Sequence, residues 1–258
     1  MASRIRLPLP LMKRSYSQQE LDDLLAVTRP RVGWDFSRMN ALRAAVPWEY
    51  ADIATHYARP SDDVLDVGTG DGARFRALAG SFGWGLGIDS DPEMVRLAAR
   101  TSTAPNVDFG ICSAQLKGIN ATFPLILNRH APLDLRAIAS HLRPRGHFIT
   151  QQVGERNMAC VRIALGLPAG EPPITAGQVA DARLRLISFR EYDVEYVVRD
   201  IESLVFWLNA LDLLHADLDG AAALASADAL NAILARNVDE RGFVTNEHRY
   251  LVVAQLPA

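Results

Sequence analysis

The chain of 258 residues has a mass of 28.3 kDa, which suits one α/β domain that folds without disulfide or metal cross-links. Hydrophobic residues make up 49% and charged residues 22%, and these ordinary values exclude a disordered chain, a collagen-like fibre and a coiled coil. The net charge is −3, and of the 27 basic residues only Lys13 and Lys117 are lysines. The arginine excess is typical of GC-rich coding. Because dedicated nucleic-acid-binding domains usually carry a basic excess, the balance argues against nucleic acid as the partner.

The two cysteines, Cys112 and Cys160, are too few for a disulfide framework or a zinc site. The apolar stretch from Leu7 to Met12 is too short and too rich in proline for a signal-peptide core. No run approaches the ~18 apolar residues of a membrane span. We therefore expect a cytoplasmic protein with no metal and no membrane partner, either a monomer or a homodimer.

The N-terminal region is expected to be helical. Leu21, Leu24 and Leu25 have helical spacing and predict a helix over 17–28. Residues 34–58 hold five aromatic side chains, and they either pack a helical extension onto the core or form a lid over a ligand pocket. These five are Trp34, Phe36, Trp48, Tyr50 and Tyr57. We take residues 1–58 as a helical extension or cap and 59–258 as the core, within one folding unit.

After Pro60, short apolar runs alternate with segments of helical spacing. The expected strands are 64–67, 84–88, 107–111, 123–127, 147–150, 184–198 and 250–255. The expected helices are 75–82, 94–100, 135–142, 200–211 and 228–236, the second of them opened by a capping box from Ser90 to Glu93. This alternation predicts βαβ units and a mainly parallel sheet, with ligands outside the carboxyl ends of the strands.

A glycine-rich turn, Asp66-Val67-Gly68-Thr69-Gly70-Asp71-Gly72, follows the first of these strands. It also fits the dinucleotide pattern G-x-G-x-x-A, but an acid two positions before the first glycine would repel a pyrophosphate. The same acid suits a cationic ammonium group, and the glycines allow close backbone approach. Asp89, 17 residues after Gly72, can accept hydrogen bonds from both hydroxyls of a ribose. An amino acid is one ligand that carries an ammonium group, and an amino acid together with a ribose indicates S-adenosylmethionine.

Three segments resemble the motifs of class I S-adenosylmethionine-dependent methyltransferases, in order and in spacing: 64–72, 87–89 and 142–148. The resemblance covers residues 45–155 and extends to 248–255. It implies a Rossmann-like α/β fold: a seven-stranded, mainly parallel sheet with its last strand antiparallel and helices on both faces. Asn128-Arg129-His130 and the later 151–154 resemble a bacterial subgroup whose members are mostly uncharacterised, so the resemblance supplies no substrate.

The resemblance also implies roles for single residues in cofactor binding. The ribose would be held by Asp89, and the usual adenine-binding aspartate is replaced by Ser113, whose hydroxyl can still accept a hydrogen bond. For Asp71 and Gly72, turn geometry and helix capping remain equally open interpretations. The complete predicted cofactor set is Asp66, Gly68 and Gly70 at the methionine end, Asp89 at the ribose, Ser113 and Leu116 at the adenine, and Asn128 beside the methyl group.

The position after the fourth strand faces the methyl group in this family, so Asn128 and His130 are the candidate catalytic residues. His130 is either a general base near neutral pH or a structural histidine. Arg129 is either a clamp for an acidic substrate or a surface or packing arginine. Weaker candidates are His56, Gln151, Gln152 and His215.

The sequence thus predicts an enzyme that transfers a methyl group by an SN2 step from S-adenosylmethionine to a small molecule, such as a secondary metabolite, and releases S-adenosylhomocysteine. A general base is required only when the acceptor holds its proton tightly. Two alternatives stay open: an RNA or protein methyltransferase, and a cofactor-binding protein of this fold without methyl transfer.

Overall fold

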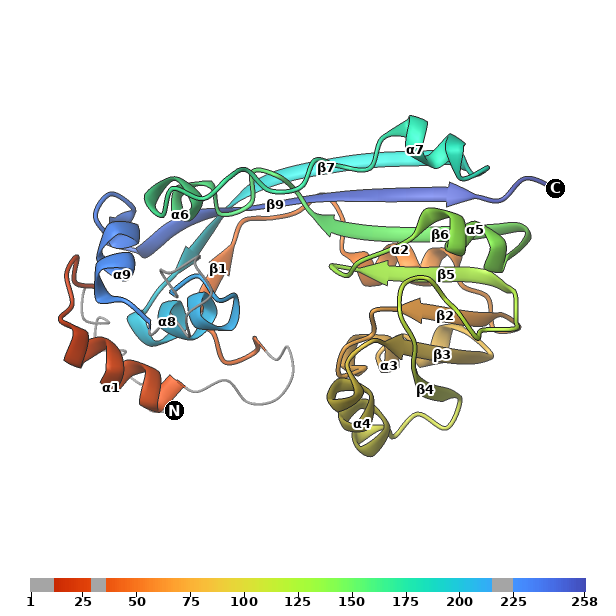
Figure 1. Cartoon of the computed structure of the whole chain (residues 1–258), viewed down its shortest axis with the longest axis horizontal. Helices are drawn as coiled ribbons and strands as arrows, with labels where there is room; N and C mark the ends of the chain where they lie inside the picture. The colour runs from red at the N-terminus through yellow and green to blue at the C-terminus, as the bar shows by residue number, and fades with distance from the viewer. Residues whose placement is uncertain (1–11, 29–35, 215–224) are drawn as a thin grey trace, which may run out of the picture.

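The computed structural model describes residues 12–28, 36–214 and 225–258. Its strands form one sheet with the order β1-β7-β9-β6-β5-β2-β3-β4, and β8 pairs with β9 beside this path (Figure 1). The strands are β1 (Ala41–Arg43), β2 (Asp63–Val67), β3 (Trp84–Asp89), β4 (Val107–Ile111), β5 (Phe123–Arg129), β6 (Leu142–Val153), β7 (Arg185–Val198), β8 (Val238–Asp239) and β9 (Gly242–Gln255).

The middle of the sheet is parallel and its far edge is antiparallel. Strands β4, β3, β2, β5 and β6 run parallel, whereas β9 runs antiparallel to both β6 and β7. The predicted Rossmann-like fold with an antiparallel last strand is confirmed. The chain adds two short strands to the seven expected: β1 on the edge of β7, and β8 in a hairpin with β9.

Helices cover both faces of the parallel part. On one face, α2 (Tyr50–Tyr57) and the short α3 (Ala73–Arg76) pack onto Val64, Leu125 and Ile149. On the other face, α5 (Leu135–His141) and α7 (Ala176–Asp181) pack onto alternate residues of the same strands. Helix α4 (Pro92–Thr101) lies against β3 and β4. This two-sided burial explains the continuous apolar runs of the central strands.

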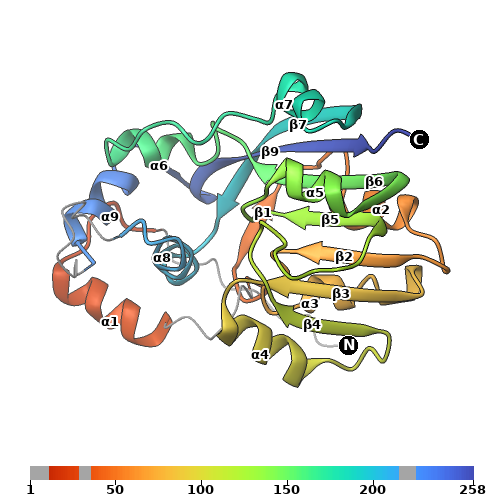
Figure 2. The same cartoon turned by 45° about the vertical axis from the view of Figure 1, so that its right-hand side comes forward.

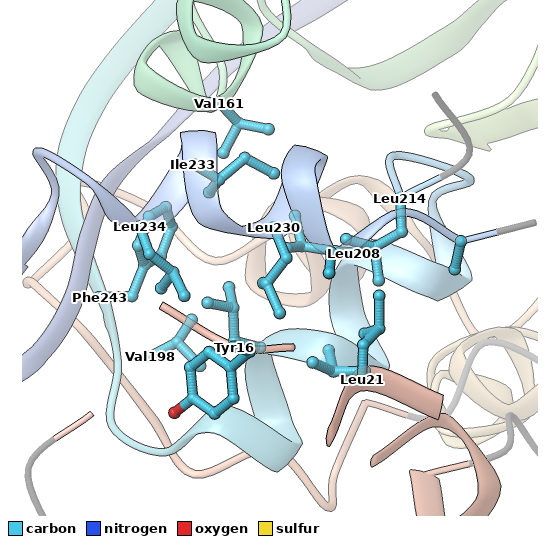
Figure 3. Close-up of a cluster of buried hydrophobic side chains, with 14 of the residues drawn as sticks. Tyr16, Leu21, Val161, Val198, Leu208, Leu214, Leu230, Ile233, Leu234 and Phe243 are labelled. Carbon is cyan, nitrogen blue, oxygen red and sulfur yellow. The ribbon is translucent and has the colours of Figure 1, made fainter. Parts of the chain in front are cut away.

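A second lobe has its own hydrophobic core at the far ends of β7 and β9 (Figures 1 and 3). It is built from α1 (Gln18–Thr28), α6 (Ala159–Ala164), α8 (Ile201–Ala210) and α9 (Ala227–Leu234). Leu21 of α1 and Leu230 of α9 are both fully buried there. The Asn231 side chain joins the N-terminal segment to α9, because it accepts from the Tyr16 amide at 2.8 Å and donates to the Tyr16 carbonyl at 2.9 Å.

The second lobe stands on the side toward which β2, β3 and β5 point (Figure 2). Carboxyl ends of parallel strands are the usual ligand-binding edge of an α/β sheet, so the lobe is placed to face a ligand there. The lobe draws on the N-terminal region and also on segments between 159 and 234. The described part of 1–58 contains a strand, β1, as well as α1 and α2. The boundary at residue 58 stays a prediction.

Two details of the sequence analysis are wrong. The expected helix over 75–82 ends at Arg76, and a 3-10 turn follows at Ala79–Ser81. The chain must then turn tightly at Gly83, where a Cβ would lie 2.9 Å from the Pro60 carbonyl oxygen. Phe75 and Phe82 still share a core, with stacked rings 5.2 Å apart.

The second correction concerns the start of α4. The cap is Asp91, not Ser90: its carboxylate accepts from the Glu93 amide at 2.8 Å. Pro92 occupies the first turn, as expected for a residue without an amide hydrogen to satisfy. None of the helices in the described part of the chain is long and apolar enough to cross a membrane.

The core of the second lobe yields the first prediction. Leu230→Ala removes a fully buried side chain from α9, so the free energy of unfolding should fall by about 2–5 kcal/mol in a urea titration. Leu42→Ala, at a side chain that is 53% exposed, should change it by less than about 0.5 kcal/mol. Equal losses in the two variants would contradict the assignment of a packed core to this lobe.

Candidate functional site

The order in which strands are added to the sheet reverses at β2, which has β3 on one side and β5 on the other. The crevice outside such a switch point is where open α/β sheets bind ligands. The glycine-rich turn lies there: the amides of Gly68 and Thr69 both donate to the Ile88 carbonyl, at 2.8 and 2.9 Å. Gly68 and Gly70 have φ of +77° and +58°. A side chain is strained in this region, and at Gly68 a Cβ would also lie 2.2 Å from the Ala131 Cβ.

Asp89 ends β3 directly beside this turn. One carboxylate oxygen accepts from the Gly70 amide at 2.8 Å and the other from the Asp91 amide at 3.0 Å. Each oxygen keeps a further lone pair, so the carboxylate is oriented by the protein and can still accept from a ligand. Ser113 follows β4 at the same edge and is exposed, and the Cys112 amide donates to the Asp89 carbonyl.

Asp66 is the acid within the turn, and its surroundings change its titration. Burial, first of all, and the nearby Asp89 carboxylate raise the pKa of Asp66 to about 6, while a hydrogen bond from the Thr69 side chain and the charge of Arg129 oppose the shift. Burial and the same Asp66 carboxylate raise the pKa of the Tyr50 phenol. An acid in these surroundings gains from a cationic ligand that compensates its charge.

The Asn128 side chain, predicted to contact cofactor and acceptor, is fully buried. Its amide nitrogen donates to the Val67 carbonyl at 2.9 Å, and its oxygen accepts from the Thr150 hydroxyl at 2.8 Å and from the Gln152 amide. These bonds tie the end of β5 to β2 and β6. The side chain has little capacity left for a ligand, and a direct role in catalysis stays a prediction.

His130 directly follows β5 with φ of +53°, and its amide donates to the Gln151 carbonyl at 2.9 Å. The imidazole Nε2 lies 3.3 Å from the side-chain nitrogen of Gln151. Desolvation, together with the charges of Arg129, Arg249 and Arg74, lowers the pKa of His130 well below 6.5. The ring is therefore neutral at pH 7 and in the form that accepts a proton.

Two of the N-terminal aromatic residues lie beside these groups. The Trp48 indole donates to the Gln151 side chain at 3.0 Å and packs edge-on against Tyr192, with centroids 4.7 Å apart. The Tyr50 hydroxyl donates to the Asn128 carbonyl at 3.2 Å. Tyr57 instead contacts His147. Phe36 contacts Phe206 in the second lobe. Part of the cluster thus borders the site and part packs elsewhere, while Trp34 lies outside the described residues.

The remaining candidates are divided between the site and other parts of the chain. Leu116 is 1% exposed within the core on the α5 face, so its contact with an adenine ring stays a prediction. Asp71 accepts from the Ala73 amide at 3.1 Å, in agreement with a capping role. His56 contacts Tyr57 on α2. His215 lies outside the described residues.

The residues present fit S-adenosylmethionine. Nε of Arg129, at the end of β5, is buried without a hydrogen-bond partner. Buried polar atoms are nearly always paired, so this unpaired atom at the edge of the sheet indicates a polar ligand. Asp66 and Asp89 add acceptors for an ammonium group and for hydroxyls. The described residues contain no cluster of three or more potential metal ligands.

A separate recess of about 680 Å³ lies on the opposite face, between α5 and α7. Its lining includes Ala131 and Gln152, and its charged lining residues are Asp134, Arg136, Glu171 and Asp181. Its lining shares none of the residues that would bind the methionine or ribose.

Sequence reasoning undervalued Arg129 and overlooked Arg74 and Arg249. The signal for Arg129 was its place directly after Asn128. Arg249 lies on β9, more than a hundred residues away, and only the pairing of β9 with β6 brings it to the site.

No family model matches the sequence, and no curated protein matches it. Solved structures do. A functionally unknown protein from Deinococcus radiodurans R1 has a TM-score of 0.62 at 18% identity, covering 84% of this chain and 92% of its own. The proposed methyltransferase BH2331 from Bacillus halodurans C-125 has a TM-score of 0.55 at 14% identity, covering 80% and 96%. The chain has the class I methyltransferase fold.

The same comparison includes the [4+2]-cyclase SpnF, with a TM-score of 0.54 at 16% identity, covering 95% of this chain and 98% of its own. Identities this low establish the fold, and the activity must be argued from the site.

Asp66 yields the second prediction. Its pKa is raised from the ordinary 3.8 to about 6, so its ionised form lowers the stability of the folded protein above pH 6. Asp66→Asn should therefore raise the free energy of unfolding at pH 7.5 by on the order of 2 kcal/mol. The gain should disappear as the pH falls from about 7 to about 4, because wild-type Asp66 takes up its proton in the folded state.

Urea titrations across this range measure the effect. Asp228→Asn, at an exposed position on α9, is the control and should show no comparable gain. A variant Asp66→Asn that is less stable than wild type at pH 7.5 would contradict a raised pKa.

Proposed function

We propose that the protein is an S-adenosylmethionine-dependent methyltransferase that acts on a small molecule. The observation that carries the proposal is the pairing of the glycine-rich turn with Asp89 at the switch point, where the Gly70 amide orients the carboxylate. A dinucleotide pyrophosphate would meet two acids here, Asp66 and Asp71. An ammonium group and a ribose meet matching acceptors.

The geometry of the site supports the following residue roles. Asp66 holds the ammonium group, the backbone at Gly68 and Gly70 lets the methionine end approach, and Asp89 holds the ribose. Ser113 offers its exposed hydroxyl to the adenine. When bound, the cofactor supplies a methyl group already activated by the sulfonium, so the protein contributes mainly orientation and exclusion of water.

We assign to His130 the role of taking a proton from an acceptor. It is neutral at pH 7 because its pKa is lowered, and the Gln151 amide near Nε2 limits the motion of the ring. A hydroxyl or carbon acceptor would use it, whereas a free amine would not need it.

The second lobe acts as the cap in this proposal, with the described part of residues 1–58 contributing α1 to it. A cap over the carboxyl edge of the sheet suits a small acceptor enclosed between the two parts. In this proposal the protein is a cytoplasmic bacterial enzyme, either a monomer or a homodimer.

A second candidate is a protein that binds the cofactor without methyl transfer. The likeness to SpnF, named a cyclase, favours keeping it, because it shows that a related fold hosts other chemistry.

The third prediction tests cofactor binding. S-adenosylhomocysteine should raise the melting temperature of the full chain, since a ligand that binds only the folded state stabilises it by mass action. Asp89→Ala should abolish most of this rise, and Asp228→Ala should leave it intact. An unchanged melting curve of wild type at saturating S-adenosylhomocysteine would contradict both candidate functions.

The fourth prediction separates the two candidates. The chain is incubated with S-adenosylmethionine and a small-molecule extract of cells, and mass spectrometry follows S-adenosylhomocysteine and products heavier by one methyl group. His130→Gln should lower the yield about 10²- to 10⁴-fold without changing the melting response to S-adenosylhomocysteine. Wild-type activity should persist down to pH 6, because the base loses its neutral form only well below 6.5.

Product formation that is unchanged in His130→Gln would contradict the role of His130 as general base but would still support methyl transfer. Cofactor binding with no methylated product from any extract would favour the second candidate.

A further inference from the structure

Arg129, the last residue of β5, is a largely buried cation without a counter-ion. Its Nε is buried and has no hydrogen-bond partner, and within residues 12–28, 36–214 and 225–258 its guanidinium makes no ion pair. The guanidinium lies over the ring of Tyr50, whose centroid is 5.8 Å from the guanidinium carbon. Burial first, and then the charges of Arg74 and Arg249, lower the pKa of Arg129 to about 10, against the opposing effects of Tyr50 and Glu247.

The strand register explains why these arginines meet. Arg129 is paired with Gln151 on β6, and Gln151 with Leu251 on β9. Leu251 packs in the core on the α2 face. Arg249 precedes it by two residues, so the alternation of side chains along β9 puts Arg249 on that same face. Strand β9 thus adds a second arginine to the surroundings of Arg129.

The three arginines differ in what already compensates them. Arg249 is paired with Glu247 at 3.4 Å and donates to Asn157. Arg74 is exposed at the start of α3 and makes no ion pair among the described residues. The charges of Arg129, Arg249 and Arg74 all act on the His130 ring, whereas two carboxylates, Asp66 and Glu247, act on Arg129. The candidate acceptor position therefore carries an excess of positive charge.

A buried guanidinium is costly unless an anion compensates it. Its planar fork matches a carboxylate or a phosphate, which it can bind through two parallel hydrogen bonds. The methionine end of the cofactor carries one positive and one negative group, so it brings no net charge from its amino-acid part to offset the excess. An acidic acceptor does.

We infer that Arg129, supported by Arg74 and Arg249, binds a carboxylate or phosphate group of the methyl acceptor, so that the acceptor is an acidic small molecule. That the bound anion belongs to a methyl acceptor rests on the proposed function. The anion site itself rests only on the surroundings of Arg129. The same carboxylate chemistry has a second possible source, the carboxylate of the cofactor, and the experiment must separate the two.

The test measures the melting temperature of the full chain already saturated with S-adenosylhomocysteine, which fills the cofactor's own carboxylate subsite. Inorganic phosphate or malonate is then added at an ionic strength held constant with sodium chloride. Wild type should gain about 2–5 °C at saturating anion. Arg129→Met should lose the gain. Arg100→Met, at an exposed arginine on α4, should keep it.

Three outcomes would overturn the inference: no gain in wild type, the same gain in Arg129→Met as in wild type, or loss of the response to S-adenosylhomocysteine itself in Arg129→Met. The last would assign the guanidinium to the cofactor carboxylate. If wild type shows the anion response but no response to S-adenosylhomocysteine, the proposed function fails while the anion site stands.

A second measurement guards against a variant that does not fold. Because Met fills similar space without a charge, Arg129→Met without ligands should melt at a higher temperature than wild type. A lower melting temperature would show that the guanidinium is compensated within the protein, and would overturn the inference.

Discussion

The pairing of β7 with β9 along their length is the constraint on which the rest of the structure depends. It runs from Arg185 opposite Gln255 to Val198 opposite Phe243. One end of this ribbon completes the central sheet through β6, and the other end enters the core of the second lobe, where Val198 and Phe243 are fully buried. The ribbon thereby fixes the second lobe relative to the carboxyl ends of the parallel strands.

The same ribbon affects the chemistry of the site. Strand β9 carries Glu247 and Arg249 toward the end of β5, where Arg129 and His130 lie. On the other side of that position, β2 supplies Asp66, an acid whose pKa is raised by burial. The site therefore holds an acid that favours a cation next to a guanidinium that favours an anion. This separation of charge suits two ligands of different character bound side by side.

The candidate site side chains are held by hydrogen bonds from the backbone and from other side chains, and these bonds stabilise their orientation before any ligand arrives. Asp89 is oriented by two amides, and Asn128 by Val67, Thr150 and Gln152. The position of His130 depends on the Gln151 carbonyl. Preorganisation of this kind lowers the cost of binding and of reaction geometry. Asn128, fully buried beside the end of β2, illustrates that a side chain at this edge can serve to orient its neighbours.

Much of this protein was determined by local sequence. Apolar runs between Val64 and Val253 predicted the seven main strands, and the turn from Asp66 to Gly72 predicted the ligand edge, because only glycine adopts these positive φ angles readily. The prediction of a helix over 75–82 was wrong, because the spacing of apolar residues cannot show where the chain must turn to enter the next strand. Only the tertiary structure decided that Arg129 is buried without a partner, that Arg249 joins it and that Asn128 is used up internally. Burial and charge compensation depend on strands brought together from distant parts of the chain, and no local pattern records them.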